Sequence, residues 1–264
     1  MDLQLKDKTA LVTGSTMGIG FAIAQLLAQE GASVVINGRS ADRVKQAMQQ
    51  IRANNPAATL IEGTADLSNQ KDRDALFSRL PSVDILVNNV GIYDAKPFTV
   101  ISDEEWQQMF EVNVMSGVRL SRHYLQPMLK NNWGRIIFMS SESGLQIPGD
   151  MVHYAMSKTA QLAVARGIAE TTAGTNVTVN SVLPGPTSSE GVMQFVKDLG
   201  KEQNKSTAQI EAEFFTTVRP TSLIKRLAAP EEVANMVAFL CSPLSSATNG
   251  AAVRVDGGIV RSIA

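Results

Sequence analysis

The sequence predicts an α/β fold: a doubly wound, Rossmann-type parallel sheet of about seven strands with helices on both faces. Two observations predict it. Short apolar segments rich in Val and Ile alternate with amphipathic segments along the 264 residues, which is the pattern of repeated βαβ units. Several of the apolar segments carry no polar alternation, as expected for strands that helices cover on both faces.

The strands and helices can be placed from these segments in chain order. The strands are expected at 9–13, 33–37, 59–62, 83–87, 135–140, 177–182 and 251–255. Between them, apolar residues with helical spacing occur near 18–30, 40–53, 69–79, 103–129, 153–173 and 230–241. No linker, low-complexity tract or strong repeat interrupts the alternation, so residues 1–264 are expected to form a single domain.

One stretch, residues 188–226, breaks this rhythm. It is polar and helix-prone, lies between two expected strands and is too long for a plain connection. Its apolar residues suit one face of each of two short helices: Val192, Met193, Phe195, Val196 and Leu199 in the first, and Phe214, Phe215 and Val218 in the second. We expect a helical lid that moves and closes over a substrate, with a rigid insertion packed away from the site as the alternative.

The composition argues against several classes of partner. The formal net charge is −1, so no basic surface for nucleic acid or for an anionic membrane is expected. No apolar stretch approaches the roughly 20 residues that span a bilayer, and the first residues do not form a signal peptide. The two histidines have no partners at metal-ligand spacing, so no metal site is predicted. The lone Cys241 is expected to be a buried thiol in a cytoplasmic protein.

A glycine-rich turn follows the first expected strand and leads directly into the first helix. Its residues are Thr13-Gly14-Ser15-Thr16-Met17-Gly18-Ile19-Gly20. Glycines let the backbone approach a pyrophosphate closely, and the free N–H groups and the dipole of a helix N-terminus favour the anion. This strand–turn–helix setting is the one that a dinucleotide-binding loop requires, although tight turns in general also use glycine.

A tyrosine, a lysine and a serine are the candidate catalytic residues. Tyr154 and Lys158 lie four residues apart in an expected helix, so their side chains share one face. A lysine ammonium favours the phenolate form of a nearby tyrosine, which suits the tyrosine for proton transfer. Ser141 lies at the end of an expected strand, where open α/β sheets bind their ligands. Its hydroxyl can hydrogen-bond a substrate oxygen, and the neighbouring Ser140 and Ser143 are rival candidates.

Taken together, these motifs resemble the short-chain dehydrogenase/reductase (SDR) family, and within it the 3-oxoacyl-carrier-protein reductase-like branch. The resemblance covers essentially the whole chain. One departure is Val90, where the family more often has alanine. The motifs, in the family's order and spacing, are Thr13-Gly-x3-Gly-Ile-Gly20, Asp66-Leu67, Asn88-Asn89-Val90-Gly91, Asn113, Ser141, Tyr154-x3-Lys158, Pro184-Gly185 with Thr187, and Asp256-Gly257-Gly258.

The resemblance implies an NAD(P)(H)-dependent oxidoreductase that transfers hydride between a nicotinamide and a carbonyl or secondary alcohol. Tyr154 is then the acid/base, Lys158 is its partner, and the family's Ser-x-x-Gly pattern selects Ser141. Asn113, by itself an ordinary polar helix residue, is implied to deform its helix and to hold a water against Lys158. The family's assembly implies a homotetramer, with dimers built from the helices at 103–129 and 153–173 and paired through the C-terminal strand and helix.

The resemblance also implies which residues contact the cofactor. Arg39 follows the second expected strand with no carboxylate at Asn37 or Gly38, and an arginine there accommodates a ribose 2′-phosphate. NADP(H) is therefore favoured, with NAD(H) as the alternative. The implied contacts are Gly14, Ser15, Met17, Gly18, Ile19, Gly20, Arg39, Asp66, Leu67, Asn88, Val90, Gly91, Tyr154, Lys158, Pro184, Gly185 and Thr187.

Three matters stay open in the sequence. The motifs do not name the small-molecule carbonyl or alcohol that is the substrate. A catalytically silent cofactor-sensing or scaffold protein on the same fold is the alternative function. Glu142 can contact substrate hydroxyls or be a solvent-facing or salt-bridged side chain, and His153 can line the rim of the site or only support the structure.

Overall fold

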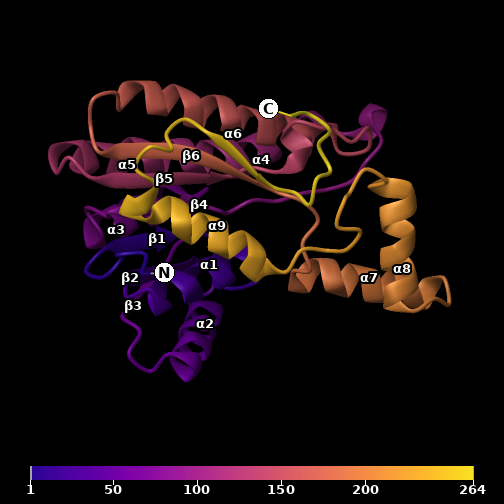
Figure 1. Cartoon of the computed structure of the whole chain (residues 1–264), viewed down its shortest axis with the longest axis horizontal. Coiled ribbons are helices and arrows are strands. Elements are labelled where there is room, and N and C mark those ends of the chain that lie inside the picture. Colours follow the sequence, from indigo (N-terminus) through magenta and orange to yellow (C-terminus); the bar gives the residue numbers. More distant parts are fainter. Residues whose placement is uncertain (1, 264) are drawn as a thin grey trace.

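The computed structural model describes residues 2–263, apart from the side chain of Phe195. Within these residues one seven-stranded parallel sheet has the order β3-β2-β1-β4-β5-β6-β7, as the sequence predicts (Figure 1). Strand order runs outward from β1 in one direction and from β4 in the other, which is the doubly wound arrangement. The strands are β1 (Thr9–Val12), β2 (Ser33–Gly38), β3 (Leu60–Thr64), β4 (Ile85–Asn88), β5 (Gly134–Met139), β6 (Val177–Pro184) and β7 (Ala252–Val255).

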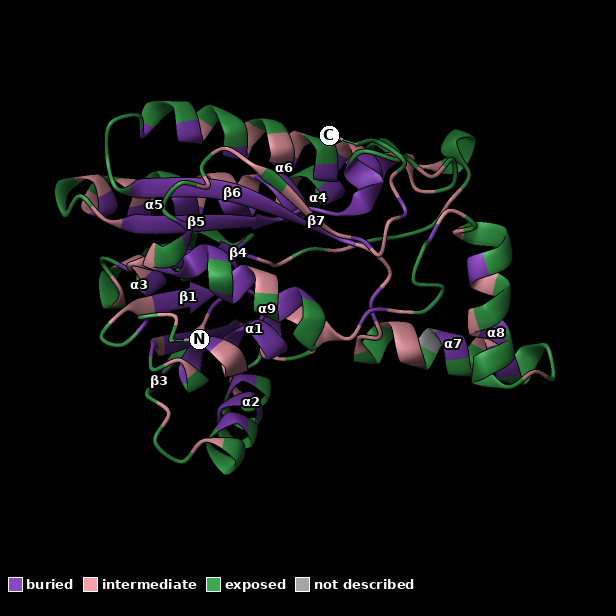
Figure 2. Ribbon diagram, in the orientation of Figure 1, coloured by how far each residue is buried: buried purple, intermediate pink, exposed green. Residues whose placement is uncertain are grey.

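Helices cover both faces of the sheet, as expected. One buried apolar cluster joins the sheet to α1 (Gly18–Gln29), α2 (Ala41–Asn54) and α9 (Pro230–Cys241). The cluster on the opposite face joins it to α3 (Gln70–Arg79), α5 (Ser116–Lys130) and α6 (Val152–Thr171). In Figure 2 the central strands are buried ribbons between these helices, whose outward faces are exposed. Burial from both sides is the reason that the strand segments are apolar without alternation.

The long helix expected at 103–129 is interrupted. Its first part, α4 (Asp103–Phe110), begins at a capping box formed by Ser102 and Glu105. A π-helical turn (Glu111–Met115) follows, and α5 continues from there. Asn113 is the middle residue of that turn, so the local deformation that the resemblance implied is confirmed. π-helical turns are frequent at functional sites.

The segment 188–226 forms a helical insertion, hereafter the lid, that follows β6. Figure 1 shows its helices standing beyond the end of the sheet layers. Val196 and Phe215 are buried, as predicted for the apolar faces of the two helices, but Val218 is 52% exposed, which differs from the prediction. The side chain of Phe195 lies outside the described residues. The lid contains α7 (Glu190–Glu202), α8 (Thr207–Glu213) and a second π-helical turn (Phe214–Val218).

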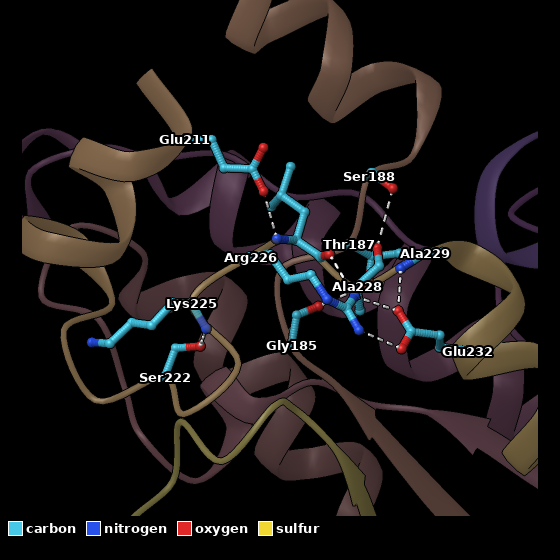
Figure 3. A network of polar contacts seen from close by, with 11 residues as sticks. Gly185, Thr187, Ser188, Glu211, Ser222, Lys225, Arg226, Ala228, Ala229 and Glu232 are labelled. Carbon is cyan, nitrogen blue, oxygen red and sulfur yellow. Dashed lines mark hydrogen bonds and ion pairs between the residues drawn. The ribbon is translucent and has the colours of Figure 1, made fainter. Parts of the chain in front are cut away.

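The two ends of the lid are fastened to each other at its base (Figure 3). The N–H of Ser188 donates to the carbonyl of Ala228 at 2.8 Å, and the N–H of Ala228 donates to the carbonyl of Pro186 at 3.0 Å. Arg226 donates to both carboxylate oxygens of Glu232, at 2.7 and 2.9 Å. The lid is therefore a closed loop whose base is fixed beside the end of β6.

Three expectations from composition concern the cysteine, membranes and metals. Cys241 is buried, as predicted, and burial raises the pKa of its thiol to about 12. Within residues 2–263, no helix is long and apolar enough to cross a membrane. The same residues contain no group of three or more His, Cys, Asp or Glu side chains placed to hold a metal ion.

Candidate active site

The glycine-rich turn joins β1 to α1 at the carboxyl edge of the sheet. Gly14 and Gly18 have φ angles of 61° and 59°, in the left-handed region that favours glycine. A Cβ atom on Gly20 would lie 2.4 Å from the carbonyl oxygen of Gly14, so a larger residue does not fit. The missing side chains therefore let the turn pack closely against the start of α1. The other predicted contacts in the turn are Ser15, which is buried, Ile19, which is half-buried, and Met17, which is exposed.

The N-terminus of α1 holds an anionic oxygen in this structure. The carboxylate of Glu190, in the first turn of α7, accepts a hydrogen bond from the N–H of Gly18 at 2.7 Å. Unpaired N–H groups and the helix dipole make this end of a helix suited to anions. Lid and glycine-rich turn therefore meet at the position where a pyrophosphate is expected.

Two asparagines without a predicted role hold this turn in shape. Asn37, in β2, accepts from the N–H of Gly14 at 3.2 Å and donates to two carbonyls at the end of β3, at 2.8 and 3.3 Å. Asn89 donates to the carbonyls of Thr13 and Gly14, at 2.8 and 3.2 Å. Both amides pair backbone groups that an irregular turn leaves without partners.

Arg39, Asp66 and Leu67 follow β2 and β3 at the same edge. The carboxylate of Asp66 accepts from the hydroxyl and the N–H of Ser68, at 2.6 and 2.9 Å. The hydroxyl bond is the main cause that lowers the pKa of Asp66, and the charge of Arg39 contributes against the opposing effect of burial. Leu67 is buried and Arg39 is exposed. Arg39 and Asp66 therefore lie near enough for their charges to interact.

The turn after β4 carries three predicted contacts. Asn88 ends β4 rather than beginning the turn, and its amide nitrogen donates to Oγ of Ser121 at 3.1 Å inside the molecule. The N–H of Val90 donates to the hydroxyl of Thr13, the residue that follows β1. A Cβ atom on Gly91 would lie 3.4 Å from Nζ of Lys158, so glycine lets this turn approach the lysine. Only the turn, and not the Asn88 side chain, faces the rest of the site.

The end of β6 supplies Pro184, Gly185 and Thr187. Pro184 is the buried last residue of the strand. A Cβ atom on Gly185 would lie 2.8 Å from the carbonyl oxygen of Asp256, so this close approach requires glycine. Thr187 is buried at the start of the lid, and its hydroxyl donates to the carbonyl of Gly185 at 2.9 Å. Thr187 thus stands between the strand end and the lid, and its contact with a cofactor stays a prediction.

Ser141, Tyr154 and Lys158 come together at the carboxyl end of β5. Ser141 follows the strand closely, and its hydroxyl is hydrogen-bonded to Tyr154. Tyr154 and Lys158 share one face of α6, with Nζ of the lysine 5.5 Å from the centre of the tyrosine ring. Lys158 is buried and donates to the carbonyl of Met139 at 2.9 Å. The structure therefore assembles the three side chains that the sequence analysis selected.

Burial moves the two titratable groups of this cluster in opposite directions. It raises the pKa of Tyr154 to about 12, although the hydrogen bond from Ser141 opposes the shift. It lowers the pKa of Lys158 to about 8. The sequence predicted that the lysine would favour the phenolate, but burial is the larger effect in this structure. At neutral pH the phenol is protonated and the lysine is charged, which suits proton donation.

Asn113 lies behind the lysine. Its side chain accepts from the N–H of Ile92 at 2.7 Å and donates to Oγ of Ser157 at 2.9 Å. Its backbone carbonyl accepts from Nε2 of Gln161 at 2.6 Å, and Oε1 of Gln161 accepts from Nζ of Lys158 at 3.3 Å. The resemblance implied a water between Asn113 and Lys158. In the structure the side chain of Gln161 links the two residues.

Glu142 lies in the loop after β5 that carries Ser141, hereafter the serine loop (Ser140–Gly144). It forms an ion pair with Arg219 of the lid. Nε of Arg219 lies 2.9 Å from Oε1 of Glu142, and the two side chains are only 13% and 4% exposed. Oε2 of Glu142 accepts from Ser143 at 3.0 Å. Of the two alternatives for Glu142, the salt-bridged one is what the structure shows. His153 is buried and packs edge-on against Trp106, which favours its structural role.

Known proteins match the chain from end to end. Residues 14–260 match the family model described as enoyl-(acyl carrier protein) reductase. YvaG, an uncharacterized oxidoreductase of Bacillus subtilis, is 49% identical over 263 residues, with all of both chains covered. The 3-oxoacyl-[acyl-carrier-protein] reductase FabG of Aquifex aeolicus is 33% identical, over 98% of this chain and all of its own. The chain belongs to the short-chain dehydrogenase/reductase family.

Solved SDR structures match the fold closely. The L-sorbose reductase of Gluconobacter frateurii, solved with NADPH and L-sorbose, has a TM-score of 0.93 at 31% identity, with all of both chains covered. An actinorhodin polyketide ketoreductase variant, solved with NADPH, has a TM-score of 0.84 at 28% identity and covers 96% of this chain and 97% of its own. This SDR chain is an NAD(P)-dependent oxidoreductase, and no match favours the scaffold alternative.

The residues at the sheet edge fit the nicotinamide dinucleotide that SDR enzymes use. The helix N-terminus that holds the Glu190 carboxylate suits a pyrophosphate. The open turn at Gly91 leaves the lysine side of the cluster accessible to a ring, because a side chain there would contact Lys158. The exposed Arg39 and the half-buried Asp66 stand on the other side of the glycine-rich turn, where the adenosine ribose is expected.

Proposed function

We propose that this SDR enzyme reduces a carbonyl compound with NADP(H), with Tyr154 as the proton donor and Ser141, Lys158 and Asn113 completing the site. The cluster of Ser141, Tyr154 and Lys158 carries the proposal, because the pKa of its phenol is raised to about 12. Such a phenol is protonated at neutral pH and can donate to a carbonyl oxygen as that oxygen gains charge. Oxidation of a secondary alcohol is the reverse reaction on the same groups.

Each residue of the cluster has one role in the proposed reduction. Ser141, fixed at the end of β5, donates a hydrogen bond to the substrate oxygen and stabilises its developing negative charge. Tyr154 gives its proton to that oxygen. The ammonium of Lys158 stabilises the phenolate that remains, because opposite charges attract strongly in a buried site. The nicotinamide, when bound, supplies the hydride.

NADP(H) is the cofactor in this proposal. Arg39 is exposed just after β2, at the position where an arginine accommodates a 2′-phosphate. The side chain of Asn37, where NAD-specific enzymes of this fold class can carry an acid, is occupied with the glycine-rich turn. The L-sorbose reductase and the ketoreductase described above were both solved with NADPH, which supports the same choice.

A small hydroxylated carbonyl compound, such as a keto-sugar, is the substrate class that we infer. The ion pair of Glu142 and Arg219 adjoins Ser141, so this side of the site offers charged hydrogen-bonding groups. The L-sorbose reductase, at a TM-score of 0.93, supports a polar substrate. The FabG relatives are reductases of 3-oxoacyl thioesters, which are therefore the comparison substrates.

The proposal treats the chain as one domain with a mobile lid, in a cytoplasmic homotetramer. The lid contacts the glycine-rich turn through Glu190 and the serine loop through Arg219, so its position is coupled to both parts of the site. A single buried thiol suits a reducing compartment. The surfaces proposed for assembly are α4, α5 and α6 for the dimer, and β7 with α9 for the pairing of dimers. Nucleic acid, membranes and metals have no part in the proposal.

Replacing Tyr154 with phenylalanine tests the proposed chemistry. Tyr154→Phe removes the proton donor and keeps the ring, so kcat for NADPH-dependent reduction should fall at least about 100-fold. Binding of NADPH, measured by its fluorescence, should be nearly unchanged. The assay uses a keto-sugar and a 3-oxoacyl thioester in parallel. Near wild-type turnover of either substrate by a folded Tyr154→Phe protein would show that the proposed mechanism is wrong.

A further inference from the structure

Gln161 lies one helical turn beyond Lys158 on α6, so both side chains lie on the same side of the helix. It is 1% exposed. Its Oε1 accepts from Nζ of Lys158 at 3.3 Å, and its Nε2 donates to the carbonyl of Asn113 at 2.6 Å. One amide therefore links the proposed catalytic lysine to the backbone of the π-helical turn. No motif of the sequence analysis contains this residue.

The two groups that Gln161 joins both need a partner. An ammonium has three N–H donors, and burial makes each missing acceptor costly. The carbonyl of Met139 takes one donor of Lys158, and Gln161 takes another. The carbonyl of Asn113 is turned toward α6, because it accepts from a side chain of that helix. A carboxamide can satisfy both groups at once because it carries an acceptor and a donor.

We propose that Gln161 is a positioning residue for Lys158: its carboxamide fixes the ammonium against the carbonyl of Met139 and ties it to the backbone of the π-helical turn. This inference rests on the proposed role of Lys158 in the reaction. The amide thereby holds the ammonium where it can stabilise the phenolate of Tyr154.

Because Lys158 is buried, the carboxamide of Gln161 should have a measurable effect on the pKa of the lysine. Burial is the cause that lowers the pKa of Lys158. The acceptor oxygen of Gln161 favours the charged lysine, so its loss should lower that pKa further. Other titratable or charged residues lie on α6 and on the elements packed against it. On α6 these include Tyr154 and His153, and on α4 and β5 they are Asp103, Glu104, Glu105 and Arg135. Two more are carboxylates in ion pairs, Glu142 with Arg219 and Glu111 with Arg119.

Two substitutions of Gln161 should shift the pH profile in opposite directions. Gln161→Leu keeps the size but removes the acceptor, so reductive kcat should fall about tenfold and its alkaline limb should move to lower pH. Gln161→Glu places a carboxylate beside the ammonium, so the same limb should move to higher pH. Asn180→Leu is the matched control, since Asn180 is a buried amide that bridges Thr248 and Ala251 away from the lysine. It should lower stability and leave the profile unchanged.

A merely structural Gln161 would give shifts of the same sign in both variants, or none beyond those of the control, and either result overturns the inference. If Tyr154→Phe and Lys158→Ala also keep their turnover, the proposed function fails as well. If they lose turnover while the Gln161 variants do not, only the inference fails. If the variants do not fold, a crystal structure of the wild-type NADPH complex tests the inference in their place. A water in place of the amide between Asn113 and Lys158 would overturn the inference directly.

Discussion

At the residue scale, the pH dependence of reduction follows from two buried groups. Tyr154 has a pKa of about 12 and stays protonated at neutral pH, whereas Lys158 has a pKa of about 8. Reduction needs the phenol proton and the ammonium that stabilises the resulting phenolate. The ammonium is fully present below its pKa and is lost as the pH rises through it, so reductive kcat should be level near neutrality and fall above about pH 8.

The pH prediction is checked with saturating NADPH and substrate between about pH 6 and 10. Stability has to be followed by circular dichroism over the same range, so that unfolding is not mistaken for titration. The apparent pKa read from this profile belongs to the coupled pair of Tyr154 and Lys158 and not to one residue. A kcat that keeps rising through about pH 9 would contradict the assignment of the ammonium.

Cofactor choice should depend on Arg39. Arg39→Asp replaces a cation with an anion where the 2′-phosphate is expected, so kcat/KM for NADPH should fall at least about 100-fold. The kcat/KM for NADH should change little, because the adenosine ribose of NADH carries a 2′-hydroxyl that a carboxylate can bind. The measurement is the ratio of the two kcat/KM values in wild type and variant. A wild type that uses NADH tenfold better than NADPH would overturn the prediction.

The sequence predicted the site residues that carry chemistry better than those that support them. Ser141, Tyr154 and Lys158 were found because residue type, spacing and position at a strand end all pointed to them. Gln161 follows Lys158 by three residues, but only the fold brings it to the carbonyl of Asn113, 48 positions away. Arg219 meets Glu142 across 77 positions. Contacts of this kind leave no local pattern, so they had to come from the structure.

At the scale of elements, the ion pair of Glu142 and Arg219 connects the lid to the serine loop. Arg219→Gln should leave a buried carboxylate without its cation beside Ser141, and unpaired buried charge is costly. We expect Tm to fall by about 5 °C and kcat/KM by at least about tenfold. Thermal unfolding and steady-state kinetics measure the two effects.

Arg226→Gln is the matched control for this experiment. It removes an ion pair at the base of the same lid, but Arg226 and Glu232 are about half exposed, and exposed pairs contribute little. Its Tm and kcat/KM should therefore remain close to those of the wild type. Equal losses in both variants would mean that any damage to the lid is felt at the site, and that the contact with Glu142 has no special part.

Element types were predictable where the pattern was long, and element ends were not. The seven strands and the helices that cover them followed from apolar periodicity. The third strand was placed at 59–62, but β3 runs through Gly63 to Thr64, because pairing with Asn37 and Gly38 of β2 overrides the low strand preference of glycine. The break after Phe110 was predictable only by resemblance, since the helical spacing continues through it.

At the scale of the whole molecule, assembly should depend on the outward face of α6. Gly167 lies on that face, and a Cβ atom added there would meet no atom within 4 Å. Gly167→Arg should therefore be harmless to the fold and even favour the helix by up to about 1 kcal/mol. It should still block the close approach of a second copy, so light scattering at micromolar concentration should show a tetramer for the wild type and a smaller species for the variant. A wild type of monomeric mass would refute the assembly.

The strand order has a consequence for how the chain is made. β1 pairs with β2 on one side and with β4 on the other, where Ala10 to Val12 lie against Ile85 to Val87. A nascent chain can pair its first three strands once residue 64 has left the ribosome, but the apolar free edge of β1 has to wait for β4. An uncovered strand edge recruits other chains. The nascent chain is therefore most prone to aggregate between the release of β3 and the release of β4 from the ribosome. Fragments that stop after β3 should be insoluble.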